Sequence, residues 1–583
     1  MMTLSHRYGI VMGGMIAVVL AMIVRLVFLM IINHTFYLDR SEKQIQKLIK
    51  IDASRGKVLD RNGYPLALSV PAYSVYASPD SIPNKPVFAK AVAPMLGMAV
   101  EDVLAKVSQP GSFVWLRRKM DAVPMDRMKA MDPKQINVLS EERRIYPNAM
   151  LMSDVVGFVG MDGGLEGLEY QFDRFLTGEQ GYYIIKGDPR GVRIISSDKT
   201  LVGLPKGFSQ GERGGEASSL KGGNITTTID YRIQFLVERL LADTIARVDA
   251  IAGQVIVMDV NEGDIIAMAN YPLFDPNAFQ SVNPSVLKNS CIVDVFEPGS
   301  IFKVITYAAA LEEQVVTPGT MLAIPEFRVI QKRRIKEAHE RSVDDPTHYE
   351  AEAILVQSMN VGTSLLADKM GKDAFYSYIQ GFGFGEKTGI MLPGEARGIV
   401  RPLSTIAPID LAVMSFGQGI SVTALQMVAA IAAIGNNGVY VPPRVVKHLT
   451  DHNHLTLSTP RVMRPHRVIS PQTAQQVRQA MKAVVDKGTG QYAAIPMVDV
   501  GGKTGTAQKP LINGRGYDDS AYVASFVGLL PIQNPRYAIL VAIDTPKKTI
   551  WGSTAGAPLF AQVATVLVDF MTDIQPHKMT SSH

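Results

Sequence analysis

The sequence contains very little cysteine, because its 583 residues include only one, Cys291. A single thiol excludes an intramolecular disulfide framework and any zinc site built on several thiolates. The excess of positive over negative charge is also small, since 59 Lys and Arg against 54 Asp and Glu leave a net charge of +5. Proteins dedicated to nucleic acid concentrate far more positive charge, so we expect no nucleic-acid partner.

Long apolar runs are equally scarce, and only residues 9–32 form one. This run is long enough to cross a bilayer as a single helix. Its one charge, Arg25, lies two thirds of the way along, within snorkelling reach of the headgroups. No small-x-small cleavage site follows, so the sequence predicts an uncleaved anchor rather than a signal peptide, with a buried core helix as the other alternative. The flanking charges leave its orientation open.

The rest of the chain has the composition of folded domains, with 47 % hydrophobic and 19 % charged residues overall. This composition excludes a disordered scaffold, and the length predicts several domains. A polar, glycine-rich stretch divides the soluble part and is typical of a linker. We therefore predict a tail (1–8), the anchor (9–32), an N-terminal non-catalytic domain (40–202), the linker (203–223), a second domain (224–575) and a tail (576–583).

The second domain alternates helical and strand patterns in an order that favours an α+β fold. Apolar residues at helical spacing predict a helix over 230–249, and two strand-like runs joined by Asn261-Glu262-Gly263 predict a hairpin. A mostly helical middle is followed by more strands and a last helix. The predicted strands are 254–260, 264–269, 498–500, 522–529 and 537–544, and the last helix is 558–574. This order predicts an antiparallel sheet between helical layers.

Ser300 and Lys303 carry the first chemical signal. A serine and a lysine three residues apart share one face of a helix, and a neutral lysine can deprotonate the hydroxyl for acyl transfer. The Glu297-Pro298-Gly299 turn places Ser300 at a helix N-terminus. In most proteins a serine and a lysine at this spacing are only a solvated surface pair. In this sequence Ser285 with Lys288 is the strongest alternative to Ser300 with Lys303. The weaker ones are Ser54 with Lys57, Ser196 with Lys199, and Ser218 with Lys221.

Two further elements follow Ser300 in order. Ser358-Met359-Asn360 supplies a hydroxyl and an amide after a helical stretch. Lys503-Thr504-Gly505-Thr506 supplies a cation, two hydroxyls and a glycine on an edge strand, which can dock an extended peptide and hold its carboxylate. A second Lys-Thr-Gly, at 387–389, lies in a glycine-rich loop and is interpreted as a turn. The charged run 331–341 is interpreted as exposed surface.

The ordered set Ser-x-x-Lys, Ser-x-Asn and Lys-Thr-Gly is the signature of penicillin-binding proteins and serine β-lactamases. Motifs outside the set make the sequence resemble the class B penicillin-binding proteins over nearly its whole length. Met359 departs from the second serine that the family often has at that position. The matching segments are 55–63, 164–169, 176–178, 296–300, 415–419 and 502–509.

The resemblance implies a penicillin-binding transpeptidase domain on an elongated N-terminal pedestal, and D,D-transpeptidation of peptidoglycan stem peptides without metal or cofactor. Ser300 would be the nucleophile, Lys303 its base and Ser358 the proton relay, with an oxyanion hole from the N–H groups of Ser300 and Thr506. Asn360 would orient the stem peptide. The residues expected to hold the terminal carboxylate are Lys503, Thr504 and Thr506, with Gly505 between them.

The resemblance also implies a setting. The enzyme would be a single-pass protein of the bacterial inner membrane with its body in the periplasm, would be acylated by β-lactams, and looks most like the division-specific, septal member. Its partners would be a polytopic glycan polymerase and other division proteins. A lateral-wall transpeptidase, a D,D-carboxypeptidase or β-lactamase-type hydrolase, and a non-catalytic divisome adaptor remain the alternatives.

Overall fold

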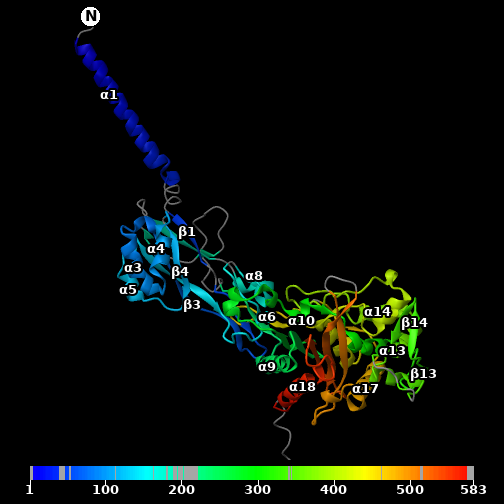
Figure 1. The fold of residues 1–583 in the computed structure, drawn as a ribbon. Coiled ribbons are helices and arrows are strands. Elements are labelled where there is room, and N and C mark those ends of the chain that lie inside the picture. The colour runs from blue at the N-terminus through cyan, green and yellow to red at the C-terminus, as the bar shows by residue number, and fades with distance from the viewer. Residues whose placement is uncertain are drawn as a thin grey trace, which may run out of the picture. The chain divides into compact units, whose positions relative to one another are not determined.

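The structure is a computed structural model (Figure 1). It describes residues 4–37, 46–51, 54–111, 113–161, 163–178, 181–187, 193–194, 201–202, 221–338, 342, 345–460, 463–511 and 516–573. Residues 203–220 of the predicted linker and the predicted tail 576–583 lie outside the described residues, as do Ser196, Lys199 and Ser218.

The N-terminal apolar run is helical, as predicted. Helix α1 (Leu4–Val27) continues into a π-helical turn, η1 (Phe28–Ile32). Residues Tyr8–Ile32 are long and apolar enough to cross a membrane, and their most apolar stretch is not buried in the protein. An apolar helix without protein packing requires another apolar environment, which is consistent with a membrane anchor.

The described chain forms two compact units, and the smaller one comprises Met1–Arg55, Val70–Arg143 and Thr177–Gly222. In it, helices α3 (Lys85–Leu96), α4 (Val100–Ser108) and α5 (Met125–Lys129) pack on the sheet formed by the second half of β3 (Pro65–Ala77) with β4 (Val114–Met120) and β5 (Ile136–Ile145). Val75, Phe88 and Leu116 are among the buried residues of this core. A separate sheet joins β1 (Gln46–Ile51), β6 (Gly181–Gly187), β7 (Arg193–Ile194) and β8 (Leu201–Val202).

The larger unit comprises Gly56–Ser69, Arg144–Leu176 and Gly223–His583, and is built around a five-stranded antiparallel sheet. The strand order is β11-β10-β24-β23-β22. The strands are β10 (Ala252–Asp259), β11 (Ile265–Tyr271), β22 (Gly501–Pro510), β23 (Tyr517–Leu530) and β24 (Tyr537–Asp544). The predicted α+β fold and its antiparallel sheet are confirmed. The predicted strand 498–500 is wrong, because β22 begins at Gly501 and carries the Lys-Thr-Gly motif itself.

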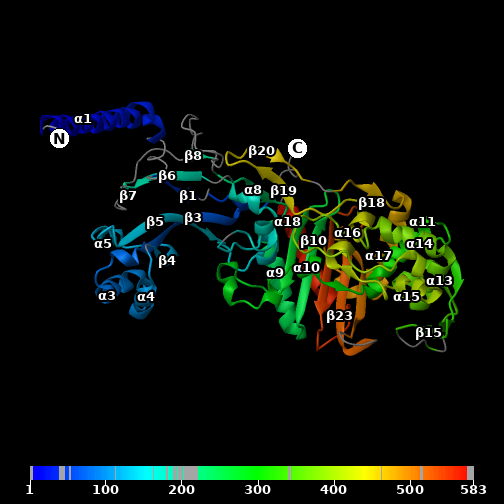
Figure 2. The same ribbon diagram turned by 90° about the horizontal axis from the view of Figure 1, so that it is seen from above.

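Helices cover both faces of this sheet (Figure 2). Side chains alternate along each strand, so Val255 and Val541 pack under α9 (Tyr231–Val248) and α18 (Gly556–Asp573). Ile256 and Leu540 point to the opposite face and join the larger core. The helices on that second side are α10 (Ser290–Val293), α11 (Lys303–Glu312), α12 (Ala351–Val356), α13 (Asn360–Met370), α14 (Lys372–Gly381), α15 (Pro408–Ser415), α16 (Ala424–Gly435) and α17 (Pro471–Lys487).

Residues 144–176 belong to the larger unit, although their sequence neighbours belong to the smaller one. Arg144 is tied there by an ion pair with Glu169, at 2.6 Å between Nε and Oε1, and donates a hydrogen bond to the Gly56 carbonyl. Both charged side chains are almost fully buried. A buried ion pair that loses one partner leaves an uncompensated charge, so this contact makes the segment costly to detach from the unit.

Candidate active site

Ser300 lies on a short 3-10 turn, η6 (Gly299–Phe302), which runs directly into α11. Gly299 adopts a φ of +53° and donates its N–H to the Gly417 carbonyl at 3.0 Å. Ile301 and Phe302 are fully buried, whereas Ser300 between Gly299 and Ile301 is only half-buried. Apolar anchors therefore fix the turn and leave one hydroxyl accessible, at the helix N-terminus where the sequence predicted it.

Lys303 is buried and surrounded by acceptors from one neighbouring segment. Its Nζ lies 2.6 Å from Asn360 Oδ1, 2.7 Å from the Ser358 carbonyl oxygen and 3.4 Å from Ser358 Oγ. Burial lowers the pKa of Lys303 to about 7, against the opposing effect of the Glu337 charge. A lysine with this pKa is partly neutral near pH 7 and able to accept a proton.

Ser358 connects Lys303 to the edge strand of the sheet. It lies between α12 and α13 with a φ of +59°, a left-handed conformation that a serine adopts only at an energetic cost. Its Oγ accepts a hydrogen bond from Lys503 Nζ at 2.9 Å. The strained backbone therefore holds the Ser358 hydroxyl between the Nζ atoms of Lys303 and Lys503.

Lys503 is fully buried on β22, the outer strand of the five-stranded sheet. Its Nζ also lies 3.2 Å from the Thr504 carbonyl oxygen and 3.3 Å from Thr504 Oγ1. Burial, together with repulsion from Lys303, lowers the pKa of Lys503 well below its ordinary value. Two protonated lysines beside one hydroxyl repel each other, so one of the two amines is readily deprotonated and a proton can pass between them.

Gly505 and Thr506 set how closely β22 approaches the Ser300 turn. A Cβ on Gly505 would lie 2.3 Å from Ser525 Oγ and 3.0 Å from the Ile301 side chain, so only glycine allows this contact. Thr506 Oγ1 accepts a hydrogen bond from the Gly552 N–H at 3.0 Å, which leaves its own O–H free to donate. The structure thus brings η6, the Ser358 loop and β22 together.

The competing motifs do not assemble in this way. Ser285 Oγ pairs with Asn283 Oδ1 at 3.0 Å, while Lys288 forms an ion pair with Asp294. In the second Lys-Thr-Gly, Thr388 is buried and its N–H and hydroxyl both donate to Glu395, which closes the irregular loop in which this motif lies.

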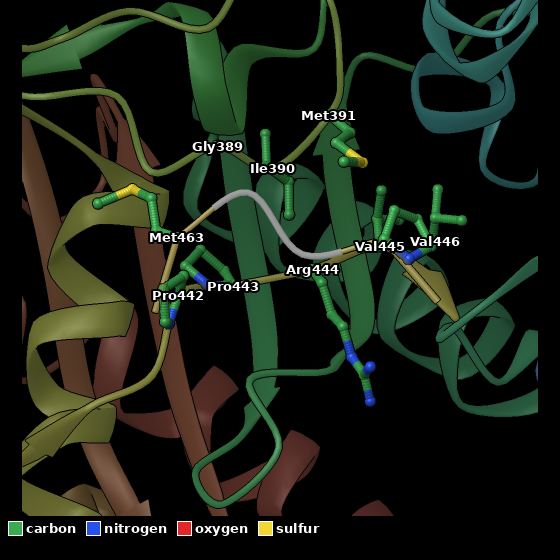
Figure 3. A pocket seen from close by; sticks show the side chains of 10 residues that line it. Gly389, Ile390, Met391, Pro442, Pro443, Arg444, Val445, Val446 and Met463 are labelled. Carbon is green, nitrogen blue, oxygen red and sulfur yellow. The ribbon is translucent and has the colours of Figure 1, made fainter. Parts of the chain in front are cut away.

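The cavity beside that turn is too small for a substrate. Its volume is about 10 Å³, and Figure 3 shows it between the Gly389 to Met391 loop and Pro442 to Val446. The Arg444 side chain points away from the loop in this view and forms an ion pair with Asp264. A space of this size holds no more than a single water molecule.

Glu337 is a site residue that sequence reasoning missed. Its carboxylate accepts hydrogen bonds from the backbone N–H groups of Asn360 and Val361, the second at 3.1 Å. Asn360 Nδ2 in turn donates to the Lys336 carbonyl at 3.2 Å. These bonds cap the start of α13 and orient the Asn360 side chain. Glu337 lies in the charged run interpreted as exposed surface, where no local pattern distinguishes it from its neighbours.

Glu297, which the sequence placed in the turn before Ser300, has a bracing role that sequence reasoning missed. Its Oε1 accepts from the Gly419 N–H at 2.8 Å and its Oε2 from the Tyr517 hydroxyl at 3.0 Å. Together with the Gly299 to Gly417 bond, these contacts connect the turn to the 415–419 segment and to β23. The arrangement can therefore hold a hydroxyl, a neutral amine, a second hydroxyl and a cation around one carbonyl, which is what serine acyl transfer requires.

Comparison with known protein families agrees with this geometry. The penicillin binding protein transpeptidase domain matches residues 253–565, and the penicillin-binding protein dimerisation domain matches residues 50–204.

Individual relatives match along most of the chain. Stage V sporulation protein D of Bacillus subtilis is 34 % identical over 526 residues, covering 88 % of this chain and 78 % of that protein. The peptidoglycan D,D-transpeptidase FtsI of Escherichia coli is 29 % identical, covering 99 % and 94 %. A crystal structure of penicillin binding protein 3 from Mycobacterium tuberculosis with aztreonam superposes with a TM-score of 0.69 at 27 % identity, covering 90 % and 97 %. The chain belongs to the class B penicillin-binding proteins, the peptidoglycan D,D-transpeptidases.

Proposed function

We propose that this enzyme cross-links stem peptides at the division septum through an acyl-enzyme on Ser300. The observation that carries the chemical part is the position of Ser358 Oγ, 2.9 Å from Lys503 Nζ and 3.4 Å from Lys303 Nζ. This hydroxyl bridges the amine next to Ser300 and the cation on the strand that docks the peptide. A proton can pass along such a bridge without entering bulk water.

In the first half-reaction, neutral Lys303 takes the proton of the Ser300 hydroxyl as the oxygen attacks the carbonyl between two terminal D-Ala residues. The backbone N–H groups of Ser300 and Thr506 hold the developing oxyanion, and each such donor is worth about 3 kcal/mol in comparable sites. The proton returns through Ser358 to the departing D-Ala nitrogen. The products are free D-Ala and an ester on Ser300.

The donor carboxylate binds at the β22 side of the site. Lys503 and the hydroxyls of Thr504 and Thr506 donate to it, and Asn360 orients the peptide backbone. A carboxylate beside Lys503 favours the protonated form of this lysine, whereas Lys303 stays neutral. Donor binding thereby separates the roles of the two amines into one cation and one base. In the second half-reaction an amine of a neighbouring stem attacks the ester and closes the cross-link.

The septal assignment and its partners rest on the resemblance to the division-specific member. The candidate anchor helix would hold the enzyme in the inner membrane, with the part of the chain that follows the helix in the periplasm. A polytopic glycan polymerase and other division proteins would be its partners there. β-Lactams would acylate Ser300 in place of the stem peptide.

Labelled penicillin tests the chemistry. We expect wild type and Ser285→Ala to be labelled and Ser300→Ala to remain unlabelled. Loss of label in Ser285→Ala alone would mean that Ser285, not Ser300, is the nucleophile. Rapid turnover of the β-lactam would favour a hydrolase. Fluorescence microscopy of the tagged full-length protein tests the cellular role, since enrichment along the lateral wall rather than at the septum would contradict it.

A further inference from the structure

A basic hairpin lies in the larger unit next to Asn360, and none of the steps described above uses its exposed side chains. Strands β14 (Phe327–Ile330) and β15 (Arg333–Lys336) pair antiparallel and lie beside α13, which begins at Asn360 (Figures 1 and 2). Residues 326–337 contain five Lys and Arg against two Glu, whereas the whole chain is nearly balanced. Positive charge is therefore concentrated at one place beside the site.

One face of the hairpin is fixed to the larger unit. Ile335 is buried in the larger core, and Arg328 Nη1 donates to Ser364 Oγ on α13 at 2.8 Å. The Lys336 carbonyl accepts the 3.2 Å hydrogen bond from Asn360 Nδ2. The hairpin is therefore a rigid extension of the wall that carries the Asn360 side chain.

The opposite face of the hairpin is exposed and combines apolar with cationic side chains. The register sets Phe327 opposite Lys336 and Val329 opposite Arg334, and these four side chains share one face because side chains alternate along a strand. Phe327 and Val329 are 40 % and 63 % exposed. We call these four residues the hairpin face. Exposed apolar side chains that are grouped and bordered by charge are typical of a binding surface.

The Arg334 side chain is held in place without being neutralised. Its guanidinium lies 3.8 Å from the centre of the Phe327 ring, a cation–π contact that holds the side chain across the face. Glu326 approaches it only to 4.0 Å, and the two side chains of this pair are 57 % and 73 % exposed. A pair of this length and exposure contributes little, so a better-placed carboxylate can replace Glu326. The exposed Lys336 lies on the same face, about 7 Å further along the strand.

The inference rests on the proposed function, in which two stem peptides meet at Ser300. The donor lies along β22 with its carboxylate at Lys503, so this wall is occupied when the second peptide brings its amine to the ester. The wall that remains open carries Ser358 and Asn360 and continues into the hairpin. The second peptide is a stem of the same kind as the donor, so its chain end also carries a carboxylate.

We propose that the hairpin face binds the acceptor stem peptide and that it selects an anionic peptide. Arg334 and Lys336 bind carboxylates of the acceptor, and Phe327 and Val329 pack against its apolar side chains. Complementary charge favours this peptide over a neutral or cationic one and brings its amine to the ester on the side away from β22.

The fate of the acyl-enzyme tests the proposal. A stem pentapeptide acylates the full-length protein in detergent, and the ester is then consumed either by water or by an added acceptor amine. The acceptor is an N-acetylated stem tetrapeptide with one free side-chain amine, which ends in a carboxylate or in a carboxamide. It lacks the second D-Ala and cannot act as a donor. Both products come from the same ester, so the ratio of cross-linked to hydrolysed product does not depend on how fast the ester forms.

We expect this ratio in wild type to be about three- to fivefold higher for the carboxylate acceptor than for the carboxamide. Arg334→Gln and Lys336→Gln should each lower the preference about twofold, and the double variant should abolish it. Arg333→Gln is the matched control. It removes the same charge from the same strand, but on the face that carries Ile335, and should keep the wild-type preference.

The acceptor comparison and β-lactam acylation separate the two ways of failing, because β-lactam acylation needs no acceptor. Equal ratios for the two acceptors in wild type, with normal β-lactam acylation, would overturn the acceptor surface and leave the proposed function standing. The basic hairpin would then be a surface for an acidic protein or an anionic lipid.

An equal loss of preference in Arg333→Gln and Arg334→Gln would also overturn the proposal, because net charge rather than one face of the hairpin would then attract the acceptor. Absence of both D-Ala release and β-lactam acylation in wild type would overturn the proposed function, and the acceptor surface with it. The comparison of the two acceptors on wild type does not depend on any variant folding.

Discussion

Replacing Glu337 by glutamine should change the pH at which the enzyme is acylated. The Glu337 charge raises the pKa of Lys303, whereas burial lowers it to about 7. Glu337 and Lys303 bind the backbone N–H and the side-chain oxygen of the same residue, Asn360, which puts the charges about 7 Å apart. At this separation and an effective dielectric constant of about 40 for a half-buried carboxylate, the interaction is worth about 1 kcal/mol, slightly less than one pH unit.

The sign of the effect follows from the role of Lys303 as a base. Acylation rises with pH as Lys303 loses its proton, so Glu337→Gln should move the midpoint of the rise to lower pH by about half to one unit. Glutamine accepts only one of the two backbone N–H bonds, so the plateau rate should also fall. The pH of the midpoint therefore measures the effect of the Glu337 charge on Lys303, and the plateau rate measures how well the hydrogen bonds of Glu337 position the site.

The assay is the second-order rate constant for acylation by a chromogenic β-lactam between pH 5 and 9. Glu313→Gln is the matched control, because its carboxylate bonds to the Tyr378 hydroxyl and Glu313 does not contribute to the Lys303 shift. An unchanged midpoint, or a midpoint that moves to higher pH, in Glu337→Gln would refute the electrostatic reasoning.

Three further predictions follow from the same site. Gly505→Ala places a Cβ 2.3 Å from Ser525 Oγ and should slow β-lactam acylation by roughly 100-fold or more, since a small misplacement of reacting groups has effects of this size; a near-normal rate would contradict the packing. Lys303→Met should abolish acylation yet raise the melting temperature at pH 7 by a few degrees. Between pH 7 and 10.5 this lysine binds more protons in the unfolded chain than in the folded enzyme, so the stability of wild type rises with pH through this window and is lowest below it. A lower melting temperature of the variant would contradict this. Glu395→Gln should lower the melting temperature through the Thr388 turn and leave the acylation rate unchanged, and slower acylation would mean that this turn belongs to the site.

The elements that the sequence predicted are those with a strong local signal. The helices over 230–249 and 558–574 appear as α9 and α18 within two residues at each end, because their apolar faces recur at helical spacing. The strand over 498–500 was wrong because β22 consists of small and polar residues, Gly501 to Lys509, with no alternating apolar pattern. What makes it a strand is its pairing with β23, a contact that no local pattern encodes.

The site residues also differ in whether the sequence carries a recognisable signal for them. Ser300, Lys303, Ser358 and Lys503 are recognisable because their spacing and order are chemically specific. Glu297 and Glu337 act through backbone N–H groups of distant segments, and sequence gives no information on which glutamate among many finds such partners. The loop around 387–389 was predicted from its glycines, whereas the Glu395 carboxylate that closes it was not.

Intact-protein mass spectrometry after mixing the full-length enzyme with a stem pentapeptide tests the central claim most directly. We predict a covalent adduct of the peptide minus its terminal D-Ala, located by peptide mapping at Ser300, present in wild type and absent in Lys303→Met. An adduct at another residue, or an adduct that forms at the wild-type rate without Lys303, would contradict the account.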